Sequence, residues 1–240
     1  MFNLLIISVI AGSLFLDVSK IENSNSSACK LSFSEKYYPL SVGNELYLNA
    51  YKKDNPSETI KLKVEVKNIE TIEGENFYYL CAPKMDIRYL IKRDETGLYM
   101  KMIKYPFLFF GNINVQIKPP LNVFKFPAYA GLKWEQEAKA EASFMFFPVN
   151  KHIKAKFEII EKQFINTNIG KIEAYLVQVM INHDSFKKNY IIEKFWYAKG
   201  IGYSRADTQT HFAEIAGYKI RDEETGLWDI RLPEKIDEYL

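Results

Sequence analysis

The stretch Tyr37–Tyr51, YYPLSVGNELYLNAY, decides the fold. Pro39 and Gly43 stand four residues apart, and an alternating run of aromatic and aliphatic residues follows them. Proline fixes φ and glycine accepts the positive φ of a turn, so the stretch predicts a turn that leads directly into a β-strand. A fainter copy, FPAYAGLKW, spans Phe126–Trp134. We therefore expect a β protein built from two related halves, each opened by the same turn.

The composition suits one large all-β body or two small ones. Of the 240 residues, 48% are hydrophobic, which is enough for a sizeable core. Aromatic residues make up 15%, mostly Tyr and Phe, whose flat rings pack well on a pleated sheet. The 32 basic and 30 acidic residues are spread along the chain, so no segment offers the concentrated positive charge that a phosphate backbone requires. We expect no nucleic-acid partner.

The first 28 residues resemble an export signal followed by a linker. Leu4–Leu16 is an apolar run interrupted only by Ser8, Gly12 and Ser13. Its length suits the hydrophobic region of a secretory signal and is short for a membrane span. A basic segment before it is missing, which leaves a buried N-terminal strand or helix as the alternative. The polar stretch at 19–27 favours export, so we expect a protein of the periplasm, cell envelope or extracellular space. Membrane association is expected only through this segment, if it is uncleaved or lipidated.

The two cysteines, Cys29 and Cys81, leave three interpretations open. In an exported protein they could pair, closing a loop of about fifty residues and adding ~3–4 kcal/mol of stability. Cys29 follows Ser-Ser-Ala and could instead carry a lipid, although the apolar run ends too far upstream for a good lipidation signal. The third interpretation is two unrelated buried thiols.

Period-two alternation predicts strands throughout the first half. In Ile60–Val66 the apolar residues alternate with Lys and Glu, which indicates a half-buried antiparallel strand. The other expected elements are a strand at 45–53, a turn at 54–57, a turn at 73–76, a strand at 77–81, a hairpin of 87–93 and 98–104, and a short strand at 113–117. The aromatic run at 105–111 does not alternate and predicts a crossing between the halves. Pro119-Pro120 is expected to break the chain.

The second half repeats this pattern. At 134–142, Trp and Ala alternate with Glu and Lys, which predicts a strand, although Ala, Glu and Lys also suit a helix. Further strands are expected at 153–159, 174–181, 190–197 and 212–220, with 174–181 apolar on both faces. The sequence ETGLY at 95–99 recurs as ETGLW at 224–228. Either the tail adds one more hairpin strand or a favoured turn sequence arose twice, and we expect the second.

These elements together predict one mainly β domain at residues 29–220. We expect a large curved antiparallel sheet or incomplete barrel with little helix. Its halves span about 36–118 and 120–220, and a charged C-terminal tail follows at 221–240.

Three segments carry a resemblance to a known family. YYPLSVGNELY at 37–47 resembles the YYPLxxGNxWxY opening of a family of uncharacterised bacterial exported proteins, many of them lipoproteins, of the TapB or DUF type. TNIGKIEA at 167–174 and WYAKGIG at 196–202 resemble that family's T-P-A-G-x-F/Y-x-A and WYAPGVGLV segments. Leu46 stands where the family has Trp, and Asn168-Ile169 where it has Pro-Ala. The resemblance implies a large curved antiparallel sheet, similar to lipoprotein carriers that hold acyl chains, and it brings no catalytic residue.

No catalytic or metal site is expected from the residue pattern. The histidines His152, His183 and His211 are far apart and have no neighbouring ligands at metal spacing. His183-Asp184-Ser185 lies in an expected turn, and neighbours in sequence do not make a catalytic triad. No glycine-rich phosphate loop joins a strand to a helix. We therefore expect no enzyme and no cofactor.

The chain carries more aromatic residues than one core requires. Two non-alternating aromatic runs, each bounded by proline, and two tryptophans suggest a hydrophobic cavity on the concave face of the sheet. The candidate ligand-binding residues are Tyr105, Phe107, Phe109, Phe110, Trp134, Phe144, Phe146 and Trp196. A partner-binding patch or a second core layer between the halves would also explain them.

The expected function is thus a non-enzymatic exported envelope protein that binds a lipid-like or other hydrophobic ligand. A structural or protein-interaction module of the envelope, without a small ligand, is the first alternative. An enzyme whose site forms only in three dimensions, around His183 or His211, is the second.

Overall fold

The computed structural model describes residues 37–106, 112–144, 147–183 and 191–240, which form an antiparallel sheet. The strands are β1 (Glu45–Lys52), β2 (Asn55–Ile72), β3 (Glu75–Ala82), β4 (Ile87–Asp94), β5 (Gly97–Pro106), β6 (Asn112–Lys125), β7 (Lys133–Phe144), β8 (Phe147–Thr167), β9 (Gly170–His183), β10 (Ile191–Ala198), β11 (Gly202–Asp207), β12 (His211–Arg221) and β13 (Trp228–Arg231). Two 3₁₀ helices, η1 (Pro83–Met85) and η3 (Ile236–Glu238), are short. Within these ranges, no helix has the length and apolar character to cross a membrane.

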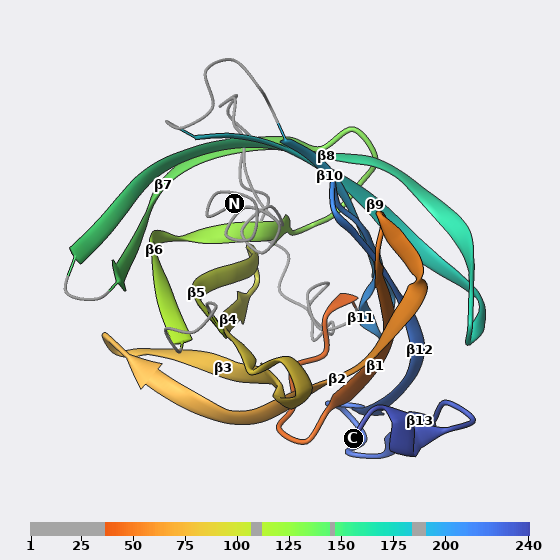
Figure 1. Ribbon diagram of the computed structural model, residues 1–240. Coiled ribbons are helices and arrows are strands. Elements are labelled where there is room, and N and C mark those ends of the chain that lie inside the picture. Colours follow the sequence, from red (N-terminus) through yellow and green to blue (C-terminus); the bar gives the residue numbers. More distant parts are fainter. Residues whose placement is uncertain (1–36, 107–111, 145–146, 184–190) are drawn as a thin grey trace.

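The sheet closes on itself through β1. This strand pairs with β2 along one edge and with β12 along the other, from Glu45↔Lys219 to Lys52↔His211. Each strand from β1 to β12 also pairs with its neighbours in sequence, so the twelve strands form an up-and-down barrel (Figure 1). The expected mainly β, antiparallel class with little helix is confirmed. Closure satisfies the backbone groups of both end strands, which an open curved sheet would leave unpaired.

The start of the organising stretch lies across one end of the barrel. We call Tyr37–Asn44 the plug segment. Its two tyrosines belong to the main core, where Tyr37 packs 5.1 Å from Tyr175 and Tyr38 packs 6.1 Å from Tyr197, between ring centroids. This end, the plug end, carries the β4–β5, β8–β9 and β10–β11 turns. The opposite end, the loop end, carries the β1–β2, β3–β4 and β11–β12 connections.

An ion pair between Arg93 and Glu223 fastens the plug segment. The Arg93 guanidinium donates to both carboxylate oxygens of Glu223, at 2.9 and 2.6 Å, and to the Tyr38 carbonyl at 2.8 Å. The Glu223 carboxylate also accepts from the Leu40 backbone N–H at 3.0 Å. Asn44 completes the attachment, because its side-chain oxygen accepts from the Arg221 N–H at 2.9 Å. Strand β4, the plug segment and the C-terminal tail are thereby joined.

The two turns that the sequence relates make the same hydrogen bonds. Gly43 has φ +91° and donates to Val66 of β2, and Gly131 has φ +86° and donates to Ile159 of β8. In both cases the next residue accepts the return hydrogen bond from that partner. Each turn therefore sets the register of the strand pair that follows it, β1–β2 and β7–β8. Positive φ explains why glycine stands at both positions.

Pro119 and Pro120 do not break the chain, contrary to the sequence expectation. They lie within β6, at an irregularity where β5 pairs Met100 with Leu121 and Met102 with Gln116. Pairing of β6 with β7 ends at Lys118, immediately before the prolines. The two prolines, which have no backbone N–H, therefore lie where β6 makes no ladder hydrogen bonds with β5 or β7.

Three other segments refine the sequence predictions. Residues 134–142 form part of β7, so alternation rather than helix propensity decided their structure. The first turn is shorter than expected, because β2 already begins at Asn55.

The prediction for the C-terminal tail was wrong: residues 228–231 form β13, which pairs with β12 beyond the end of β11. The recurring ETGL sequence therefore marks a second hairpin turn.

Along each strand, the side chains point alternately into the barrel and toward its outer face. On β9, Val177 and Val179 belong to the interior cluster, whereas Ala174 and Leu176 pack on the outer face against β10. The expectation that this strand is covered on both faces holds at Ala174 and Leu176, whereas Gln178 and Met180 on the same outer face are only half-buried. Trp134 stacks on Phe157 at 4.3 Å between centroids, and these rings fill the barrel beside β7 and β8. The interior beside β1–β5 is packed less tightly.

Candidate functional site

A cavity of about 220 Å³ lies inside the barrel. Side chains from β1–β6, η1, β10–β12 and the plug segment line it, and none of the lining residues comes from β7–β9. The lining is Leu46, Leu48, Leu62, Val64, Leu80, Ala82, Met85, Ile87, Ile91, Leu98, Met100, Val123, Phe195, Ala213 and four tyrosines. Lining residues from the same strand are two positions apart, such as Leu46 and Leu48 of β1 or Leu62 and Val64 of β2. This spacing arises because inward-facing and outward-facing side chains alternate along a strand. The half-buried strand predicted at 60–66 thus forms part of the cavity wall.

The four tyrosines are Tyr38, Tyr89, Tyr197 and Tyr203. Every other described lining residue is apolar, so the polar side-chain atoms of the described lining are the hydroxyl groups of these tyrosines. Burial raises the pKa of Tyr89 to about 12. Burial also raises the pKa values of the other three tyrosines, and neighbouring tyrosines add to the shift. All four hydroxyls therefore keep their protons at neutral pH.

Glu193 is a buried carboxyl on the inner face of β10. It lies two residues from Phe195 and four from Tyr197, both of which line the cavity, and only 1% of it is exposed. Neither carboxyl oxygen has a hydrogen-bond partner among the described residues. Burial raises the pKa of Glu193 to about 8, although the nearby Gln209 backbone and Lys53 act in the opposite direction. The Gln209 amide is therefore close, but its geometry falls short of a hydrogen bond.

A surface ion pair covers this carboxyl at the loop end. Lys53 pairs with Asp207, and both side chains are more than a third exposed. Thr208, which follows Asp207, is buried and bonds the His211 carbonyl through its hydroxyl at 3.0 Å. Glu193 thus lies between this polar rim and the apolar cavity.

The sequence itself contains a signal for Glu193. In IIEKFWYA the residues at 191, 195 and 197 are apolar and point inward, and Glu193 shares their register. A carboxylate in the inward register of a strand is unusual, because buried charges need partners. The tyrosines gave no such signal, since Tyr89 and Tyr203 converge only through the closed barrel.

The candidate residues from the aromatic runs do not gather in one place. Tyr105 and Trp134 lie in the main core, and the Trp134 indole N–H donates to the Asn122 carbonyl at 2.9 Å. Trp196 lies on the outer face of β10, with the Arg205 guanidinium 5.6 Å above its ring. None of these three lines the cavity. Phe107, Phe109, Phe110 and Phe146 lie outside the described residues, as does the side chain of Phe144, so a ligand-binding role for the set stays a prediction.

The cysteines and histidines add no reactive cluster to the described structure. Cys81 is a buried free thiol whose pKa is raised by burial, and Cys29 lies outside the described residues. His211 shares a 2.7 Å hydrogen bond with Thr210, and His152 lies 3.4 Å from Glu137. The side chain of His183 is outside the description. In the described ranges, no three potential metal ligands come together.

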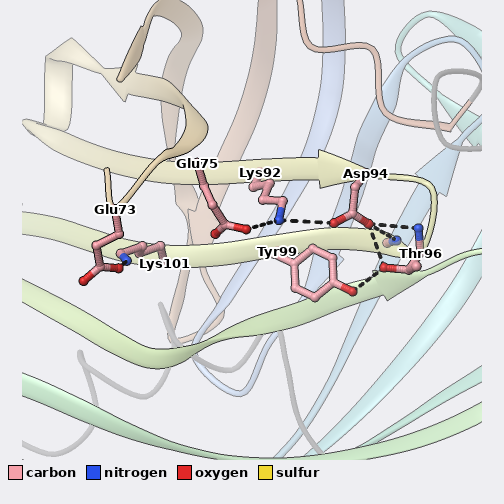
Figure 2. Close-up of polar contacts among 8 residues, drawn as sticks. Glu73, Glu75, Lys92, Asp94, Thr96, Tyr99 and Lys101 are labelled. Atoms are coloured by element: carbon pink, nitrogen blue, oxygen red, sulfur yellow. Dashed lines mark hydrogen bonds and ion pairs between the residues drawn. The ribbon is translucent and has the colours of Figure 1, made fainter. Parts of the chain in front are cut away.

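A polar network follows the outer face of β3–β5 (Figure 2). Lys92 contacts Glu75 at 2.5 Å and Asp94 at 3.4 Å, and the Asp94 carboxylate accepts from the backbone and hydroxyl of Thr96. The Thr96 hydroxyl in turn contacts the Tyr99 hydroxyl at 2.5 Å. The groups run along the strands rather than converging on one point, which is the arrangement of a solvated sheet surface.

The comparisons with known proteins are structural. No protein-family model matches the chain, and no curated protein matches it, so membership of the family inferred from the three motifs stays a prediction. The fold is similar to that of a presumed lipoprotein from Parabacteroides distasonis, with 14% identity, 77% of this chain and 99% of that chain covered, and a TM-score of 0.47. It is also similar to a presumed exported protein with a YmcC-like fold from Bacteroides fragilis, with 12% identity, 76% and 98% coverage, and a TM-score of 0.48. A third similar structure is the hypothetical lipoprotein YmcC of Escherichia coli, with 9% identity, 81% and 97% coverage, and a TM-score of 0.44.

Proposed function

We propose that this protein is an exported, non-enzymatic component of the cell envelope that holds a small hydrophobic ligand inside its barrel. The cavity of about 220 Å³ carries this proposal, because a closed barrel could have filled the same space with side chains. An engineered apolar cavity of about 150 Å³ in another protein binds benzene. By that scale the cavity has room for roughly ten non-hydrogen atoms, which suits a short acyl chain or a single ring rather than a whole phospholipid.

The lining offers binding contacts rather than reactive groups. Leu, Ile, Val, Met and Phe side chains contribute dispersion and desolvation. The tyrosine hydroxyls keep their protons at neutral pH, so they donate and accept hydrogen bonds but do not act as bases or nucleophiles. Export is supported by the apolar run at 4–16 and the polar stretch after it.

Filling the cavity tests the proposal. Ala213 lines it, so Ala213→Leu places an additional apolar side chain in the binding space. Toluene is expected to raise the melting temperature of the wild-type protein and to have little effect on this variant. The matched control, Lys125→Leu, adds the same side chain on the exposed face of β6 and should keep the toluene response. Equal toluene shifts in all three proteins, or no shift of the wild-type protein by either toluene or 1-octanol, would rule out the cavity as a ligand site.

An envelope interaction module is the second candidate, because the tail exposes apolar residues. Leu227, Trp228, Ile230 and Leu232 are each more than 40% exposed. They lie on or beside β13, whose outer edge is unpaired in the described structure. A photo-crosslinker at Ile230 should then trap a specific envelope protein in cells, whereas one at the exposed Lys67 of β2 should not.

A further inference from the structure

The cavity contains no charge. Among its described lining residues there is no Lys, Arg, His, Asp or Glu. A carboxylate or phosphate that entered would lose its hydration without gaining a cationic partner, at a cost of several kcal/mol. Lys53 is engaged by Asp207 at the surface, and Glu193, the buried carboxyl on β10, is an acid. The site therefore disfavours anions.

The cavity does contain polar atoms, and they come from more than one wall. Tyr197 and Tyr203 lie on the neighbouring strands β10 and β11, with their rings 6.5 Å apart. Tyr89 lies on β4, on the other side of the ring in Figure 1, and Tyr38 enters from the plug segment. None of the described residues forms a hydrogen bond with these four hydroxyls. A ligand between the walls thus meets unpaired groups that both donate and accept.

These hydroxyls face the cavity, where a ligand can reach them, and one hydrogen bond from a ligand to a hydroxyl contributes about 1 kcal/mol net. A purely apolar ligand leaves them unpaired, whereas an alcohol, ester or amide group satisfies at least one. Tyrosine differs from phenylalanine here only in the hydroxyl, and phenylalanine would have filled the wall at no polar cost. The four hydroxyls therefore point to a ligand with a polar group of its own.

We propose that the cavity selects a small uncharged amphiphile, with an apolar body of about eight to ten carbons and one neutral hydrogen-bonding group, over the anion of the same length. The inference rests on the proposed function and names its ligand class. Tyr89 and Tyr203 hold the neutral group between opposite walls, and the aliphatic side chains of β1, β2 and β5 hold the body. Glu193, two residues before Phe195 on the inward register of β10, carries no positive charge in either protonation state.

Binding of three eight-carbon probes distinguishes the alternatives. Calorimetric titration at pH 7 compares 1-octanol, octanoate and octylamine, with toluene as an apolar reference. We expect 1-octanol to bind at least about tenfold more tightly than octanoate, which corresponds to 1.4 kcal/mol. We expect octylamine to bind more weakly than 1-octanol, because the amine is charged at this pH and the lining offers no ionised carboxylate.

Two variants connect the selectivity to the hydroxyls. Tyr89→Phe and Tyr203→Phe each remove one oxygen and keep the ring. Each should weaken 1-octanol binding about fivefold, the value of one hydrogen bond of about 1 kcal/mol, and leave toluene binding unchanged. Tyr99→Phe on the outer face of β5 is the matched control and should change neither.

The outcomes separate this inference from the proposed function. If neither toluene nor 1-octanol binds, the cavity is not a ligand site and both proposals fail. If toluene binds but octanoate equals 1-octanol, or the Phe variants leave 1-octanol unaffected, only the selectivity for a neutral amphiphile is overturned. Tightest binding of octylamine, lost in Glu193→Gln, would overturn it in favour of cation recognition by the carboxyl.

Discussion

Glu193 shows how one residue can couple the barrel's stability to pH. Its carboxyl is buried without a hydrogen-bond partner among the described residues, and burial raises its pKa from 4.5 to about 8. The unfolded chain loses this proton near pH 4.5, whereas the folded protein retains it up to about pH 8. Between these values the folded state binds more protons, so the contribution of Glu193 to stability falls as pH rises through the window.

Glu193→Gln should remove this dependence. The amide keeps the size of the side chain and never ionises, so we expect the variant to gain about 4–5 kcal/mol over the wild type at pH 9 and little at pH 4. Urea unfolding at pH 4, 7 and 9 measures the difference. Glu161→Gln, on the exposed face of β8, is the control and should follow the wild type at each pH. A wild-type stability that does not fall between pH 5 and pH 8 would contradict the assignment.

The tail is the element whose role the structure changed most. Strand β13 extends the sheet beside β12, and Glu223, in the turn before it, holds Arg93 and the plug segment. Tyr239 reaches back to β1, where its ring packs 5.6 Å from that of Tyr47. The charged C-terminal residues are thus fastened to both the first strand and the plug.

Gly217 of β12 allows this close approach. A Cβ atom at this position would lie 2.6 Å from Pro233 Cδ and 2.7 Å from the Arg231 carbonyl oxygen. Gly217→Ala therefore forces the tail away from β12 and should destabilise the protein by about 1–3 kcal/mol in urea unfolding. In a chain that ends at Gly226 the same substitution should have little effect, because the atoms it meets are absent. A similar loss in both chains would show that the tail is not the cause.

The barrel as a whole should unfold in one step. Its main cluster combines residues of both halves, such as Ile103 and Val115 with Phe157 and Val179. Closure through β1 and β12 also ties the first strand to the last strand of the ring. Neither half, 36–118 or 120–220, has a complete core by itself.

We therefore expect a single cooperative transition. Two of the tryptophans, Trp134 and Trp196, lie in the second half, so their fluorescence reports on that half, while far-UV circular dichroism reports on every strand. The two urea curves should coincide. Two separated transitions would instead indicate halves that fold independently.

Much of the barrel could be predicted from local pattern. The alternation at 60–66, 134–142 and 153–159 predicted β2, β7 and β8, and Gly43 and Gly131 predicted turns that the structure shows to be equivalent. The candidate site could not be predicted in the same way. Tyr89 and Tyr203 are 114 positions apart, and only the curvature of the closed sheet brings them to one cavity.

The sequence by itself determined where the strands begin, where the turns lie and which side chains face the interior. These features depend on the period of two along a strand and on the backbone freedom of glycine, which act over only a few residues. Only the tertiary structure decided that β1 meets β12, that the two prolines lie where their missing donors are not needed, and that Glu193 is enclosed. These outcomes depend on the stagger of all twelve strands around the ring. That stagger is set by packing between residues distant in the chain, which no local pattern contains.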